Sequence, residues 1–348
     1  MKKNILLLIF IIPLAGFPQN DEKGKVTFSG YVEAYYSYDF NNPENNQRPD
    51  FLYNFSRHNE FSINLGVLKA NYQAETIRAN LAFMGGNYAQ YNLSNEPIWG
   101  QIINEASVGV RLHKKIWFDM GIMPSHIGFE SWYGMDCWHL SRSILADNSP
   151  YFFTGARINY EVNQKLDLVF WATNGWQNIQ REDKKRGIGL GLGVDHRPVK
   201  GLLIHYANYL GNEGADPQRL LRFFNNFYTQ YEKNKWGITI GVDYGIQQAE
   251  FVDFNEWYGV TASLKRSLGQ KFYIAGRYEY YSDPKAIIVN EAMKVSGFSA
   301  NLDYQLFESA LFRLELRQFT SSEAIFPLPA GKFSGGNTAI TGSFAVRF

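Results

Sequence analysis

The sequence predicts an all-β protein: a transmembrane, antiparallel, up-and-down β-barrel of about sixteen strands. Three observations predict it: long segments alternate between apolar and polar residues, the chain begins with a secretory leader, and it ends on Phe348. No later segment comes near eighteen consecutive apolar residues, which a membrane-spanning helix requires. A barrel needs apolar residues only at alternate positions, so a chain with a mean hydropathy of −0.30 can still lie in lipid.

The leader at residues 1–19 has the layout of a signal peptide. Two lysines precede the apolar run Ile5–Leu14, and small residues follow it. The alternative interpretation is an apolar N-terminal strand, although strands rarely begin with so continuous a run. We expect cleavage within Gly16–Gln19, which leaves residues 20–348 as a single barrel domain in the cell outer membrane of a Gram-negative bacterium.

Alternation is clearest in the last segment of the chain. One face carries apolar residues or glycine, and the other carries small or polar residues and one arginine: Ile340, Gly342, Phe344, Val346 and Phe348 against Thr341, Ser343, Ala345 and Arg347. The same pattern runs through residues 26–39, 76–83, 105–112, 238–247, 298–305 and 312–317. A period of two is typical of a strand whose two faces meet different surroundings.

Alternation alone does not distinguish a membrane barrel from a soluble β-sandwich, but three features favour the membrane. The segments run to ten or more residues, whereas soluble strands average about five or six. Aromatic residues cluster near segment ends, as interfacial girdles require, at Tyr35, Tyr36 and Tyr38, at Tyr278, Tyr280 and Tyr281, and at Phe223, Phe224, Phe227 and Tyr228. Full charges in the middle of strands suit a water-filled lumen.

Sixteen strands are expected, at residues 25–40, 57–73, 75–88, 103–113, 115–124, 151–162, 165–177, 187–197, 200–210, 218–232, 235–248, 254–267, 270–282, 293–307, 309–320 and 337–348. An even number brings both termini to one side of the membrane. The short joins would be periplasmic turns, and the stretches 41–56, 125–150 and 321–336 would be outer loops. Strands 165–177 and 218–232 alternate least strictly, so fourteen or eighteen strands are also compatible with the pattern.

The composition argues against several other classes of protein. One cysteine, Cys137, excludes an intrachain disulfide and a cysteine-based zinc site. Thirty-four basic and 33 acidic residues give a net charge of +1, so nothing indicates a nucleic-acid partner. The six histidines are scattered, and neither a nucleophile elbow nor a calcium loop is present. We therefore expect no metal, no cofactor and no enzyme activity, although a catalytic site assembled from distant strands would leave no local motif.

Two stretches resemble known outer-membrane proteins. Phe344, Val346 and Phe348 look like the terminal signature by which the assembly machinery recognises outer-membrane barrels. The stretches 127–130 (IGFE), 138–143 (WHLSRS) and 148–157 (NSPYFFTGAR) resemble the putative β-barrel porin-2 family, OmpL-like, of Gram-negative bacteria. The motif spans only 127–157, while similarity of layout covers nearly the whole mature chain. This resemblance implies a barrel and a pore, and no particular substrate.

The expected loop 125–150 is the most informative segment. A connection of about 26 residues is long for a barrel, and long loops are usually functional. In porins a long loop folds into the lumen, where opposed charges set size and ion selectivity. The candidate constriction residues are Glu130, Asp136, His139, Arg142 and Asp147. On this hypothesis Glu130 and Asp136 attract cations, Arg142 opposes them across the gap, and deleting residues 131–138 raises conductance. The alternative is a surface loop packed on its neighbours.

Glycines at every second position of residues 187–193 remove side chains from one side of a strand. They leave room for an infolded loop or a large ring, or they tune the curvature of the barrel. They do not match a dinucleotide-binding loop, which has a different glycine spacing.

The first functional hypothesis is a porin that lets small hydrophilic solutes diffuse passively through an aqueous lumen. The expected lumen charges are balanced: Arg78, Arg111, Arg157, Arg313, Arg317 and Arg347 against Glu33, Glu105, Glu161, Asp243, Asp303 and Glu315. The second is a closed structural or partner-binding barrel, which bulky inward residues such as Tyr31, Tyr35 and Trp257 favour. The third is an enzyme on the barrel rim. The expected partners are outer-membrane lipid, lipopolysaccharide, the barrel-assembly machinery and small solutes; the sequence does not indicate an oligomeric state.

Overall fold

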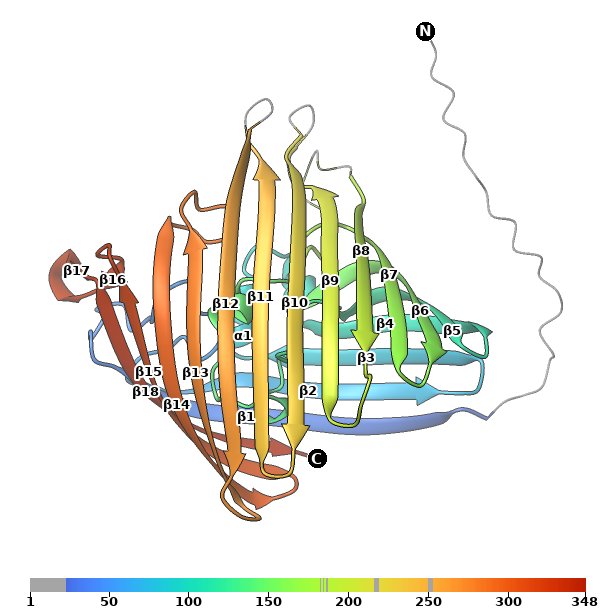
Figure 1. Ribbon diagram of the computed structural model, residues 1–348, viewed down its shortest axis with the longest axis horizontal. Coiled ribbons are helices and arrows are strands. Elements are labelled where there is room, and N and C mark those ends of the chain that lie inside the picture. Colours follow the sequence, from blue (N-terminus) through green and yellow to red (C-terminus); the bar gives the residue numbers. More distant parts are fainter. Residues whose placement is uncertain (1–22, 182, 184, 186, 216–218, 250–252) are drawn as a thin grey trace, which may run out of the picture.

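The structure is a computed structural model that describes residues 23–348, apart from 182, 184, 186, 216–218 and 250–252. The expected signal peptide at 1–19 therefore lies outside the described residues. No described helix is long and apolar enough to cross a membrane. Strands make up most of the described chain, and they form one continuous wall (Figure 1).

Sixteen long strands close into an antiparallel barrel in the described part of the chain, each paired with its neighbours in sequence. They are β1 (Lys25–Asp39), β2 (Phe61–Gln73), β3 (Ile77–Gly85), β4 (Ile103–His113), β5 (Ile116–Pro124), β6 (Phe152–Asn163), β7 (Leu166–Thr173), β8 (Gly189–His196), β9 (Leu202–Asn212), β10 (Leu221–Lys233), β11 (Trp236–Gln248), β12 (Phe254–Ser267), β13 (Phe272–Asp283), β14 (Met293–Phe307), β15 (Ala310–Ser321) and β18 (Gly336–Arg347). The up-and-down barrel of sixteen strands is confirmed.

The ring closes between the first and last strands. Their register runs from Tyr31 opposite Arg347 to Asp39 opposite Ala339. The amide of Gly30 donates to the carbonyl of Phe348 at 2.6 Å, and the amide of Phe348 donates back to Gly30 at 3.0 Å. The last residue is therefore part of the seam, which leaves no exposed strand edge there.

The long connections all lie at one end of the barrel, and they hold the short elements. These are α1 (Asn87–Asn92), α2 (Ile98–Gln101), η1 (Gly134–Asp136), α3 (Ile144–Asp147), η2 (Pro329–Gly331) and a small hairpin of β16 (Phe326–Pro327) and β17 (Phe333–Ser334). The opposite end carries short turns.

Several strands are shorter than the alternation predicts, because the backbone leaves the extended region. Asn59 has a φ of 55°, so β2 begins at Phe61 and not at residue 57. Gly86 and Gly175 have φ values of 121° and 137°, which end β3 and β7 a few residues short of the predicted bounds. The two least regular segments, 165–177 and 218–232, both contain strands.

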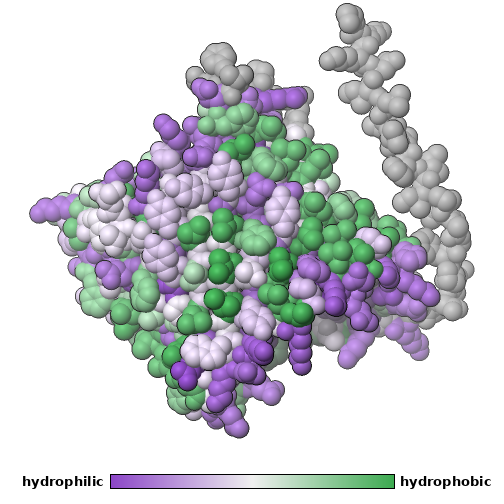
Figure 2. Space-filling model, in the orientation of Figure 1, coloured by the Kyte–Doolittle hydropathy of each residue, from purple (hydrophilic) through white to green (hydrophobic). Residues whose placement is uncertain are grey.

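The two faces of the wall differ as the alternation predicts. On β1 the outward ring of Phe28 is 81% exposed, whereas the inward ring of Tyr31 is 1% exposed. Figure 2 shows hydrophobic side chains across the outer wall and hydrophilic ones gathered toward the ends. The aromatic clusters do not form girdles as a whole: Tyr35, Phe224 and Tyr281 point inward and are buried. Successive strand residues point to opposite faces, so only alternate members of each cluster can face lipid.

Candidate functional site

The connection between β5 and β6 crosses the inside of the barrel. Near its start, His126 Nε2 contacts the carbonyl of Asn208 on β9 at 2.9 Å. Further on, the amide of Leu140 donates to Asn301 on β14 at 2.9 Å. Tyr133 of the loop donates to Asn104 on β4, and His139 contacts Ser263 on β12. Strand β12 lies half the ring away from β4, so the loop spans the lumen. The predicted inward course is thus found in the structure.

Arg313 on β15 anchors the middle of this loop. Its guanidinium donates to the carbonyls of Gly134, His139 and Cys137 at 2.7, 2.8 and 2.9 Å. Asp303 on β14 holds the same guanidinium at 2.8 Å. An arginine presents five donors in a fixed fork, so it can serve several carbonyls and a carboxylate together.

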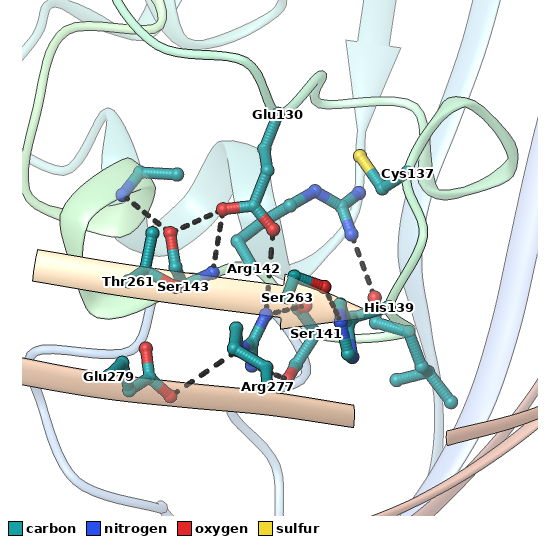
Figure 3. Close-up of polar contacts among 12 residues, drawn as sticks. Glu130, Cys137, His139, Ser141, Arg142, Ser143, Thr261, Ser263, Arg277 and Glu279 are labelled. Carbon is teal, nitrogen blue, oxygen red and sulfur yellow. Dashed lines mark hydrogen bonds and ion pairs between the residues drawn. The ribbon is translucent and has the colours of Figure 1, made fainter. Parts of the chain in front are cut away.

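A second anchor is a buried ionic network on β13 and β15. Glu279 pairs with Arg317 at 2.7 Å and accepts the amide of Ile144, also at 2.7 Å. Arg277 donates to the carbonyl of Ser141 at 2.9 Å and lies 3.5 Å from Glu130, as Figure 3 shows. These groups are nearly inaccessible to solvent, so removing one partner leaves an uncompensated buried charge, at a cost of about 3–5 kcal/mol.

Arg142 lies inside the fold of the loop. Its guanidinium donates to the carbonyls of Ser131, Leu140 and Trp132 at 2.6, 2.7 and 3.1 Å, and the side chain is fully buried. The expectation that Arg142 opposes Glu130 and Asp136 across an aqueous gap is therefore wrong. The donors of Arg142 are used by the backbone of its own loop.

The other four constriction candidates also hold the loop in place, and three of them are buried. Glu130 accepts hydrogen bonds from the amide and hydroxyl of Ser143. His139 Nε2 lies 2.5 Å from the hydroxyl of Ser263 on β12, and Asp147 accepts from Asn54 at 2.8 Å. Asp136 is the exposed one of the four, and it pairs with Arg347 at 2.7 Å.

Burial changes the ionisation of three groups in this loop. It raises the pKa of Asp147 to about 7 and that of the Cys137 thiol to about 11. It lowers the pKa of His139, and the nearby guanidinium of Arg277 acts in the same direction. His139 is therefore neutral at physiological pH.

The predicted lumen-lining charges divide into two groups. Arg313, Glu315 and Arg317 face inward, but the loop covers them, so they do not line open space. Arg78 and Arg157 line a cavity of about 490 Å³ on the side of the loop that faces the short turns, which we expect to be the periplasmic side. Arg111 lies beside that wall, with its guanidinium 4.8 Å from the ring centroid of Trp117.

Asp119 and Trp117 organise this open wall and were not among the predicted site residues. Asp119 accepts from Arg78 at 2.6 Å and from Arg157 at 3.3 Å. The guanidinium of Arg78 also stacks 4.2 Å from the ring centroid of Trp117. Both residues alternate inward on β5, so the period-two pattern contained the signal that would have identified them.

The glycines of β8 receive the start of the loop. A Cβ at Gly191 would lie 2.6 Å from the ring of His126, and one at Gly189 would lie 2.5 Å from the ring of Tyr209. The sequence allowed two interpretations of these alternating glycines. Close approach of the loop and of a large ring explains why Gly189 and Gly191 carry no side chain.

A second cavity, of about 380 Å³, lies on the side of the loop that faces the long connections, which we expect to be the extracellular side. Its lining includes Tyr53, Trp176, Gln177 and Arg222, and it shares no lining residue with the periplasmic-side cavity. Within the described residues, no group of three or more histidine, cysteine, aspartate or glutamate side chains is placed to hold a metal ion.

The predicted assembly residues lie on the outer surface near the seam. Phe344 stacks on Phe312 of β15 with ring centroids 4.1 Å apart. The ring of Phe348 is 67% exposed and covers the Cα of Gly30, where a Cβ would lie 2.3 Å from the ring.

Comparisons with known proteins agree with this architecture. The sequence profile of the family described as putative β-barrel porin-2, OmpL-like, matches residues 25–348. No curated protein sequence matches the chain.

Similar solved structures include an anion-selective porin from Comamonas acidovorans, with a TM-score of 0.63 and 10% identity over 94% of this chain and 100% of that one. The outer membrane channel DcaP of Acinetobacter baumannii gives 0.62 and 11%, over 95% and 100%. OmpF of Salmonella typhi, in complex with daunomycin, gives 0.61 and 10%, over 93% and 98%. At such identities the likeness shows a shared fold.

Proposed function

Because the chain belongs to the putative β-barrel porin-2 family, OmpL-like, and is an outer-membrane porin, we propose that small hydrophilic solutes cross it along one side of the lumen. The middle of the loop is anchored on β12–β15, its start also contacts β9 and β10, and the charged cavity lies against β3–β10. The open cavity left on this side of the lumen is the observation that carries the proposal. Family membership makes the protein a channel and not an enzyme.

The proposed constriction is formed by the body of the loop, and its charges act mainly by positioning it. Glu130, His139, Arg142 and Asp147 fix its shape, and the exposed Asp136 is the candidate charge that a passing ion meets. Ion preference then depends on the open wall of Arg78, Asp119 and Arg157, where a low-dielectric surround strengthens local fields.

Export and assembly complete the proposal. Residues 1–19 act as a cleaved signal peptide, and residues 20–348 form one barrel domain. The barrel-assembly machinery recognises the terminal strand through Phe344 and Phe348, whose rings face outward. Outer-membrane lipid and lipopolysaccharide surround the apolar wall.

A closed barrel is the second candidate, and one observation favours it: the cavities on the two sides of the loop share no lining residue. Conductance of the purified protein in planar bilayers distinguishes the two. A porin gives stepwise ohmic currents in KCl, and a closed barrel gives none. Arg313→Gln removes a loop anchor and should raise conductance, whereas Glu308→Gln, in an exposed turn, should not.

A further inference from the structure

The cavity on the periplasmic side of the loop presents hydrogen-bond donors near the loop and acceptors near the periplasm. It is lined by inward residues of β6, β7 and β8 and by the start of the loop. Strand register places these residues in rows, since Arg157 lies opposite Trp171, and Glu161 lies opposite Asp167. The rows are four residues apart, which is about 13 Å along a strand.

The row nearer the loop supplies hydrogen-bond donors. Arg157 stacks with its guanidinium 5.2 Å from the ring centroid of Trp171, and Arg78 reaches the same cavity from β3. The indole N–H of Trp171 is buried and has no hydrogen-bond partner among the described residues. An indole nitrogen can only donate, so this end suits an acceptor such as a carboxylate.

The row nearer the periplasm supplies acceptors. Asp167 lies opposite Asp195, and Asp195 lies opposite His205. Asp195 accepts from His205 Nδ1 at 2.5 Å, and the buried Nε2 of His205 has no partner in the described structure. Glu161 is exposed at the mouth of the cavity. This end suits a donor such as an ammonium group.

Short side chains between the two rows leave the cavity hollow. The intermediate row pairs Asn159 with Val169 and Val169 with Gly193. The hollow therefore lies between a row of donors and a row of acceptors, and it suits a solute that carries both charges.

We propose that this cavity is a binding subsite for small zwitterions, namely free amino acids or dipeptides with ionised amino and carboxyl groups. The inference rests on the proposed function, because such a solute reaches the cavity through the lumen. It adds a solute class to a channel for which the sequence predicts no preference.

The charge balance of the lining favours a zwitterion over a simple ion. Arg78 and Arg157 share the carboxylate of Asp119 at 2.6 and 3.3 Å, and Arg197 pairs with Asp167 and Asp195 at 2.6 and 2.8 Å, so groups of both signs line the cavity. A simple anion meets repulsion from the carboxylates, and a simple cation meets repulsion from the guanidinium groups. Burial lowers the pKa of His126 to about 4, so its ring adds no charge.

Isothermal titration of the purified protein in detergent tests the proposal with three probes of similar size. Glycylglycine carries both charges, N-acetylglycine only the negative one, and glycinamide only the positive one. We expect glycylglycine to bind about tenfold more tightly than either analogue, as expected from one additional charge-assisted contact. Glu161→Gln should weaken glycylglycine and glycinamide by about tenfold and leave N-acetylglycine unchanged. Glu308→Gln, which changes an exposed carboxylate in the turn between β14 and β15, is the matched control.

Equal affinities for the three probes, no binding of glycylglycine, or an unchanged Glu161→Gln protein that still migrates as a folded barrel would each overturn the subsite. Conductance in KCl is measured on the same preparations. Currents without zwitterion preference overturn this inference and leave the porin intact. Zwitterion binding without currents supports the subsite and overturns the proposed diffusion.

Discussion

Arg142→Met tests whether this arginine holds the loop or faces the solute. Methionine keeps an unbranched side chain of similar length but removes every donor. Three backbone carbonyls then lose a charged partner inside a buried loop. Hydrogen bonds to charged groups contribute about 1.5–3 kcal/mol each. Because the loop relaxes in part, we expect the free energy of local opening to fall by about 3 kcal/mol.

Cys137 reports that opening without an engineered label. It is the single cysteine of the chain and is buried within the loop, where its Sγ lies 3.2 Å from the amide of Ser131. Burial raises its pKa to about 11, so the wild-type thiol should react slowly with a methanethiosulfonate reagent at neutral pH. A decrease of about 3 kcal/mol in the free energy of local opening predicts that Cys137 is labelled roughly a hundredfold faster.

Arg347→Met is the matched control, because the pair of Arg347 with Asp136 is half exposed and should contribute at most about 1 kcal/mol. Cys137→Ser shows the background reaction. The reasoning fails if Arg142→Met labels at the wild-type rate while its reversal potential under a salt gradient shifts toward cations. That result would mean that the guanidinium faces an aqueous passage.

Three further predictions concern pH, assembly and the barrel itself. The folded pKa of Asp147, about 7, exceeds its ordinary value of 3.8, so the stabilisation from its protonated form is lost as pH rises through 7. The rate of Cys137 labelling, corrected for thiolate content, should therefore increase between pH 5.5 and 8. Asp147→Asn should remove this increase. Phe348→Ser should lower the amount of assembled barrel in cells more than refolding in detergent; equal assembly would show the terminal ring to be incidental. The mature protein should fractionate with the outer membrane and migrate differently on gels before and after boiling, and recovery in the soluble periplasm would contradict a closed membrane barrel.

The fold was predictable because its signal is local. Each strand of a barrel separates lipid from lumen, so the two faces differ at every second residue and the pattern is visible in short segments. Tyr31 and Trp257 were placed inside by this rule, and both are buried there. The aromatic clusters were predicted to be girdles from their position near segment ends, but alternation divides neighbouring rings between the two faces, and Tyr35, Phe224 and Tyr281 are buried inside.

The site was less predictable because it depends on contacts between distant residues. Arg111 and Arg313 both alternate inward in the sequence, and nothing local distinguishes them. In the structure the loop covers Arg313 and leaves Arg111 beside Trp117 on the open wall. The partner of Arg313 is a set of carbonyls about 175 residues away, which no spacing rule reveals.

The irregular backbone of the loop explains which groups the inward-facing charged side chains contact. Its helical turns, η1 and α3, are too short to pair most of its own amides and carbonyls. A buried backbone group without a partner is costly, so the wall must supply donors and acceptors. Arg313 supplies donors to three carbonyls, while Glu315 and Glu279 accept the amides of Ser141 and Ile144. Charges that resemble a selectivity ring in the sequence thus hold the loop in place, and we propose that ion preference depends instead on the wall that the loop leaves uncovered.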